Sequence, residues 1–173
     1  MENFNIDIFK KSFDFLPLGL RVNNPGCIRY SASNRWKGQQ GSYRGFCRFE
    51  AFEYGVRAIT LLLCRYMHKY RLFDVETMME RYAPYKDGNF PRVYADTIAK
   101  LCGVRSINKD IRLMKIELPL VIISIFKVEN GSEYTNRSYN KEFCIYLLGL
   151  ISKYIDEYLE GVVYPGYGKV TEL

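Results

Sequence analysis

Apolar side chains recur at helical spacing between residues 52 and 70, and this repeat constrains the fold more than any other feature of the chain. The charged residues of the segment fall outside the stripe, which predicts an amphipathic helix with one face on a core. His68 lies in a polar stretch that we expect on an exposed part of this helix. The stripe consists of Phe52, Val56, Ile59, Leu63, Tyr66 and Tyr70.

Weaker repeats and end signals predict further helices. Asp74 is a suitable N-cap because its carboxylate can accept bonds from first-turn amides, and Pro84 stands just beyond the end of that helix. Pro91 suits a first helical turn, while Gly103 and Gly161 suit the positions after a helix end. The helices predicted in this way cover residues 2–16, 75–82, 91–101 and 141–160.

The apolar segment 118–131 allows two interpretations. Its β-branched run is typical of a buried strand, and Asn130-Gly131 is a common hairpin turn. Pro119, however, would suit the first position of a helix, and Asn-Gly also suits a helix C-terminus. We favour a buried helix, since the other long elements are helical.

Residues 17–45 are rich in Gly, Asn, Ser and Pro and predict a long ordered loop with one short strand near residues 28–30. Loops of this length in compact domains usually carry function. The length of 173 residues fits one domain with one core. We therefore expect a mainly α, single-domain protein over residues 1–173, with at most a small β element and an irregular tail over 161–173.

Charge and aromatic content narrow the ligand classes. The chain has 25 Lys and Arg against 19 Asp and Glu, a formal charge of +6, and it contains 15 Tyr and 11 Phe. A positive balance favours polyanions such as nucleic acid, anionic lipid or the acidic bacterial wall. Tyrosine faces stack on sugars and bases, although they also fill cores. Composition alone does not choose among these ligands.

Cysteine and histidine usage argues against several classes of site. The five cysteines form no Cys-x-x-Cys pair, so they predict free thiols from a reducing compartment and no zinc site. His68 is the only histidine, which leaves few metal constellations, and we expect neither a metal nor a cofactor. No segment is long enough to span a bilayer, and the N-terminus lacks an ordinary secretory signal. The chain is therefore expected to be made in the cytoplasm.

Five short segments, in order, resemble one known family. Residues 21–30 read Arg-Val-Asn-Asn-Pro-Gly-Cys-Ile-Arg-Tyr and residues 36–38 read Trp-Lys-Gly. Residues 49–58 read Phe-Glu-Ala-Phe-Glu-Tyr-Gly-Val-Arg-Ala, residues 81–84 Arg-Tyr-Ala-Pro, and residues 129–131 Glu-Asn-Gly. This series is similar to that of phage and prophage virion-associated, lysozyme-like proteins, which carry an Asn-Asn-Pro-Gly-Asn-Ile-Arg motif and are related to wall-degrading interbacterial toxins.

The resemblance covers roughly residues 21–135 and implies a lysozyme-like helical fold. It further implies a peptidoglycan-degrading glycoside hydrolase or lytic transglycosylase, of phage origin or delivered as an antibacterial effector, that acts at the bacterial cell wall or periplasm. Glycan strands would be the substrate, and an immunity protein or a virion or secretion component would be a partner. The alternatives are a non-enzymatic virion or secretion-apparatus protein that binds wall glycan or nucleic acid, and a Cys27/His68 amidase or protease.

A glycan hydrolase needs a carboxylic acid that stays protonated near neutral pH, often with a second carboxylate about 5 to 10 Å away. Glu129 is the leading candidate, because it follows an apolar run that would desolvate it. Glu50 and Glu53 are candidates for the second carboxylate, although an acid such as Glu53 also suits a first helical turn, where it could pair with Arg57. The candidate substrate-binding residues are Asn24, which would alternatively form a tight turn, and the aromatic residues Tyr30, Trp36, Tyr82 and Tyr94, which would alternatively serve packing.

Overall fold

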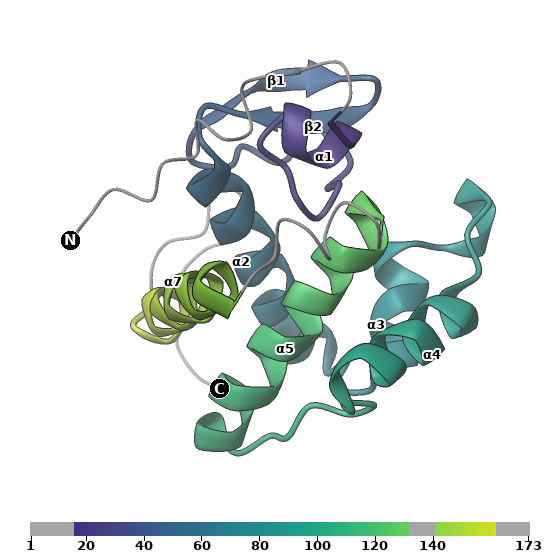
Figure 1. Ribbon diagram of the computed structural model, residues 1–173, viewed down its shortest axis with the longest axis vertical. Coiled ribbons are helices and arrows are strands. Elements are labelled where there is room, and N and C mark those ends of the chain that lie inside the picture. The colour runs from purple at the N-terminus through teal and green to yellow at the C-terminus, as the bar shows by residue number, and fades with distance from the viewer. Residues whose placement is uncertain (1–15, 132–140, 162–173) are drawn as a thin grey trace.

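A computed structural model describes residues 16–131 and 141–161. It confirms a mainly helical protein (Figure 1). Residues 2–15 of the predicted N-terminal helix and residues 162–173 of the predicted tail lie outside the described residues. The helices in the described part are α1 (Leu18–Arg21), α2 (Phe52–Tyr70), α3 (Val75–Tyr82), the 3-10 helix η2 (Tyr85–Asp87), α4 (Pro91–Cys102), α5 (Ile111–Asn130) and α7 (Lys141–Leu159).

Helix α5 runs through the middle of the molecule and contacts α1, α4 and α7 (Figure 1). The preference for a buried helix over 118–131 is confirmed, but the predicted start at Pro119 is wrong. The helix begins at Ile111, where Asp110 accepts a hydrogen bond from the Arg112 amide at 2.8 Å. A proline inside a helix costs about 3 kcal/mol, and burial of several apolar side chains at about 1.5–3 kcal/mol each outweighs that cost. The fully buried side chains of α5 are Leu118, Val121, Ile122, Ile125 and Phe126.

Helix α2 has the predicted bounds, yet two of its charged side chains are buried. Arg57 and Arg65 are only 7% and 5% exposed, and His68 is half-buried. The predicted pairing of Arg57 with Glu53 is wrong: Arg57 binds Glu157 of α7 through bonds from Nε to both carboxylate oxygens at 2.9 and 3.1 Å and a closer one from Nη2. The partner comes from α7 because that helix packs along α2 and buries this side of it.

The small β element is a hairpin of β1 (Gln39–Tyr43) and β2 (Phe46–Phe49), which packs on α2. Its two turn residues, Arg44 and Gly45, both have positive φ, as a tight two-residue hairpin requires. The predicted strand near residues 28–30 is reduced to a single bridge between Arg29 and Phe46. This bridge fastens the N-terminal loop to the edge of the hairpin.

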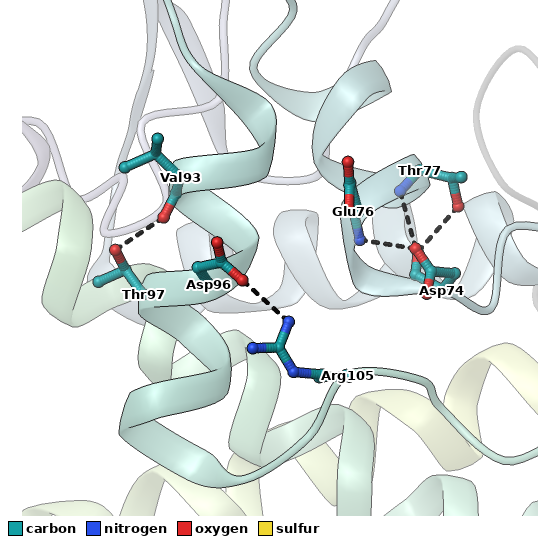
Figure 2. A network of polar contacts seen from close by, with 7 residues as sticks. All are labelled: Asp74, Glu76, Thr77, Val93, Asp96, Thr97 and Arg105. Atoms are coloured by element: carbon teal, nitrogen blue, oxygen red, sulfur yellow. Dashed lines mark hydrogen bonds and ion pairs between the residues drawn. The ribbon is translucent and has the colours of Figure 1, made fainter.

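The connection from α4 to α5 is tied back to the start of α3. Asp74 caps α3 as predicted, accepting bonds from the Glu76 and Thr77 amides at 2.9 and 3.2 Å (Figure 2). Arg105 donates to Asp96 of α4 at 2.9 Å (Figure 2), and its carbonyl accepts a bond from the Val75 amide. These contacts hold α3 and α4 as one unit beside α5. Among residues 16–131 and 141–161, no helix is long and apolar enough to cross a membrane.

Candidate functional site

Glu129 stands half-buried in the last turn of α5, where the helix ends against the N-terminal loop. Tyr94 of α4 donates its hydroxyl hydrogen to Glu129 Oε1 at 2.5 Å. The Cys27 thiol of the loop also bonds to this carboxylate, and the charge of Arg29 acts on it. The site therefore joins a helix end, a neighbouring helix and a loop that are far apart in the sequence.

Burial is the largest influence on the Glu129 carboxyl and raises its pKa. The bonds from Tyr94 and Cys27 and the positive charge of Arg29 act in the opposite direction but leave the pKa above that of an ordinary glutamate. Burial and the nearby Glu129 charge also raise the pKa of the Cys27 thiol and of the Tyr94 hydroxyl. Glu129 thus keeps a proton at higher pH than a solvated glutamate, beside two neutral donors.

Asn24 builds the loop that carries Cys27. Its side chain has no solvent exposure and its amide donates to the carbonyls of Ile28 and Cys47 at 2.9 and 3.0 Å. Its Oδ1 accepts a bond from the Ile28 amide at 2.9 Å. These bonds give Asn24 the turn-forming role in this structure, with its side chain directed into the loop.

The Glu-Asn-Gly segment at the end of α5 has one task per residue. Asn130 donates to the Pro25 carbonyl at 2.8 Å, which clamps the loop onto the helix. Gly131 follows at a φ of 80°, a conformation that glycine adopts without strain and that ends the helix. Glu129 therefore faces Tyr94 and Cys27, while Asn130 fixes the loop that forms one side of the site.

Two glycines allow the loop to lie directly on α2. A Cβ atom on Gly55 would stand 2.0 Å from the Asn23 carbonyl oxygen, and one on Gly26 would stand 2.4 Å from Ile59 Cδ1. A larger residue at Gly55 would displace the loop backbone, whereas one at Gly26 would displace the Ile59 and Tyr82 side chains. This close packing of the loop on α2 determines how far Cys27 lies from the helices.

A groove of about 240 Å³ adjoins the Glu129 site. Cys27 and Tyr82 line it and also interact electrostatically with Glu129, while Tyr82 donates a short bond to the Gly26 carbonyl. Trp36, 6% exposed, forms another part of the lining. The structure therefore brings together Glu129, Tyr94 and Tyr82, with Trp36 in the adjoining groove.

The other predicted site residues lie elsewhere. Glu53 is half-buried, accepts a bond from the Tyr146 hydroxyl at 2.9 Å and lines a separate groove of about 880 Å³ beside α7. Glu50 and Tyr30 are exposed at the hairpin. A catalytic pair between Glu129 and Glu50 or Glu53 stays a prediction.

Cys27 and His68 line different cavities, and the cavity of His68 also contains Cys64 and Tyr158. This arrangement gives no support to the thiol-protease alternative. All five cysteines are free thiols. Within the described residues, no group of three His, Cys, Asp or Glu side chains is placed to hold a metal ion.

Three neighbours of the site were not selected from the sequence as functional residues: Arg29 and Arg81, and Cys27 in its role beside the carboxylate. Arg29 acts on Glu129 and forms an ion pair with Asp87 at 3.4 Å. Arg81 lines the groove and lies over the Tyr66 and Tyr70 rings. Arg29 and Arg81 both fall inside the segments that carry the family resemblance, which was the available signal.

Fold and site together define a class: a small, mainly helical domain in which a half-buried, tyrosine-bound carboxyl closes the end of a central apolar helix. No protein-family model matches the chain. The chain is 31% identical over 130 residues to protein P5 of Pseudoalteromonas phage PM2, a match that covers 72% of this chain and 79% of P5. The chain belongs to the family of this bacteriophage protein.

Proposed function

We propose that this protein is a phage-derived, lysozyme-like enzyme that degrades peptidoglycan, as a glycoside hydrolase or a lytic transglycosylase. The observation that carries the proposal is the Glu129 carboxyl, whose pKa burial raises and whose oxygen accepts the Tyr94 hydroxyl bond. A general acid works best when its pKa lies near the working pH. Glu129 meets this requirement better than a solvated glutamate.

In the proposed reaction, protonated Glu129 donates its proton to the glycosidic oxygen as the bond from that oxygen to the anomeric carbon breaks. The resulting carboxylate then accepts a proton from the hydroxyl that attacks the anomeric carbon. Tyr94 and Cys27 hold the carboxylate in place between these two transfers, since each donates a hydrogen bond to it. The Glu129 carboxyl donates a proton in the first transfer and recovers one in the second, so it ends the reaction protonated as it began.

The surroundings of Glu129 favour the version with a single carboxylate. The groups that act on its pKa are the donors Tyr94 and Cys27 and the cation Arg29. Glu53 instead acts on the tyrosines of α7, Tyr146 and Tyr154. A single carboxylate suits a lytic transglycosylase, in which a hydroxyl of the sugar itself attacks and leaves an anhydro product.

The phage relationship supports the proposed setting. A phage particle has to cross the envelope of its host, and the +6 charge of this phage-related chain suits the acidic wall. We place its action at the cell wall or periplasm, with glycan strands as substrate and a virion component, secretion component or immunity protein as a partner. Tyr82 is the half-buried aromatic surface offered to the substrate in the adjoining groove, whereas Trp36 is buried and supports the groove from within.

Digestion of purified peptidoglycan, followed by mass analysis of the released fragments, tests the proposal. A hydrolase adds one water to each cleaved bond, whereas a transglycosylase releases anhydro fragments without water. Glu129→Gln should abolish release, and Glu160→Gln, which removes an exposed carboxylate beyond the end of α7, should not. Full activity of a folded Glu129→Gln protein would remove Glu129 from the reaction.

The second candidate is a non-enzymatic protein that binds wall glycan or nucleic acid. The observation that favours it is the set of three cations around the groove, Arg29, Arg81 and Lys86. In that case the protein without substitutions would bind peptidoglycan or nucleic acid and would release no fragment. The same digestion experiment therefore separates the two candidates.

A further inference from the structure

The groove beside Glu129 carries an excess of positive charge. Arg29, Arg81 and Lys86 line it, and Asp87, paired with Arg29 at 3.4 Å, is the one carboxylate in its lining among the described residues. Two cations, Arg81 and Lys86, therefore have no carboxylate opposite them in this lining. An anionic group entering the groove would meet these two side chains.

Aromatic rings hold the Arg81 guanidinium at the groove. Its carbon lies 3.7 Å from the Tyr70 ring centroid and 5.4 Å from that of Tyr66, distances at which ring and cation attract. Although burial alone would raise the pKa of Tyr70, the hydrogen bond from Arg65 and the charges of Arg81 and Lys69 hold it below its ordinary value. Positive potential is thus concentrated where α2 and the end of α3 meet.

The size of the groove limits what can enter it. About 240 Å³ is less than the roughly 300–1,000 Å³ of a typical small-molecule pocket. A substituent of a glycan strand fits this space better than the strand itself. Because Cys27 and Tyr82 line the groove and also interact with Glu129, a substituent bound in the groove would lie close to the Glu129 site.

From these observations we infer that the groove binds carboxylates of the peptide stem on the sugar next to the cleaved bond, with Arg81 and Lys86 as the recognition residues. The inference rests on the proposed wall-degrading function and specifies its substrate as peptide-bearing glycan. Arg81 offers a planar donor fork suited to a carboxylate, and Lys86 offers a point charge beside it. A neutral glycan of equal length lacks the groups that these side chains recognise.

Binding to the Glu129→Gln protein tests the inference, because this variant leaves the ligand intact. Three soluble ligands of equal glycan length are compared: peptide-bearing peptidoglycan fragments, the same fragments after amidase treatment, and chitin oligosaccharides. Peptide-bearing fragments should bind most tightly, and added salt should weaken this preference. Equal binding of peptide-bearing and amidase-treated fragments would overturn the inference and would leave the Glu129 activity result untouched.

The double variant Arg81→Gln, Lys86→Gln should weaken binding of peptide-bearing fragments by about tenfold. It removes two partly exposed ion pairs, each of which contributes up to about fivefold. The matched control, Lys100→Gln with Arg112→Gln, removes the same charge from exposed sites outside the groove and should leave binding unchanged. Melting temperatures of the variants show whether they are folded. The single variant Lys86→Gln removes one cation and keeps the contacts of Arg81 with the aromatic rings. Unchanged preference in the double variant would overturn the inference, as would tighter, Arg81- and Lys86-dependent binding of DNA.

Discussion

Glu129 and Glu53 each accept a hydrogen bond from a tyrosine hydroxyl, but they stand at opposite ends of their helices. Glu53 lies in the first turn of α2, where the positive end of the helix stabilises a negative charge. Glu129 lies in the last turn of α5, at the negative end, beneath the clamped loop. The same pair of side-chain types, a glutamate and a tyrosine, therefore meets the positive end of one helix and the negative end of another.

The surroundings of the two carboxylates differ as well. Glu53 lines the large groove together with Arg57, Lys153 and Glu157, so charges of both signs are gathered there. The carboxylate of Glu129 meets two neutral donors and one cation in a crowded space. The comparison predicts that Glu129 keeps its proton to higher pH than a solvated glutamate does.

The largest expected effect concerns activity. Glu129→Gln should lower peptidoglycan cleavage by about 100-fold or more, as loss of a general acid does, while Glu53→Gln should cost less than about tenfold. Initial rates of fragment release from purified peptidoglycan measure both. Equal losses in two folded variants would break the comparison and would establish the two-carboxylate mechanism.

The next effect concerns the pH profile. The Tyr94 hydroxyl stabilises the charged form of Glu129, so Tyr94→Phe should raise the pKa of Glu129 further. The activity that depends on protonated Glu129 should then persist to higher pH. Tyr146→Phe, which removes the corresponding bond to Glu53, should leave the profile in place. A shift to lower pH in Tyr94→Phe would show that the bond does not act on Glu129.

The smallest effect concerns stability. Between the ordinary and the raised pKa of Glu129, the folded chain holds a proton that the unfolded chain has released, so stability falls as pH rises through this window. Glu129→Gln removes the buried charge that causes this loss and should raise the melting temperature above this window, by roughly 2–4 °C for each 1 kcal/mol recovered in a domain of this size.

The gain from Glu129→Gln should vanish at about pH 4, close to the ordinary pKa of glutamate. Glu53→Gln, which removes a carboxylate from the other groove, serves as the matched control. Thermal unfolding of all three proteins across pH provides the measurement. A Glu129→Gln protein that is less stable than its parent near neutral pH would contradict the cost assigned to burial.

Local sequence signals predicted the bounds of the helices well, but they predicted poorly which side chains pair between helices. The bounds of α2 and α3 follow from periodicity and from the Asp74 cap, both of which depend on neighbouring residues. Arg57 was assigned to Glu53 because that partner is one turn away, whereas its actual partner lies 100 positions along the chain. Pairings of this kind depend on how helices pack, which no local pattern specifies.

The candidate site was also predicted only in part, because its contacts, too, depend on how distant segments pack. The apolar run before Glu129 predicted its desolvation, and burial is the main cause of its raised pKa. The hairpin of β1 and β2 escaped prediction because β1 is almost wholly polar and exposed, without an alternating apolar face. The thiol donor Cys27 was missed because its approach to the carboxylate depends on the close packing of Gly26 on α2.

The clamp between Asn130 and the Pro25 carbonyl joins residues 105 positions apart. During synthesis, the loop emerges from the ribosome long before the helix end that completes the site. Domains with such distant contacts form them late, after the entropy of closing the intervening chain has been overcome. A nascent chain that ends after α4 therefore contains Tyr94 and Cys27 but not Glu129, and the three side chains come together only once α5 has been synthesised and docked.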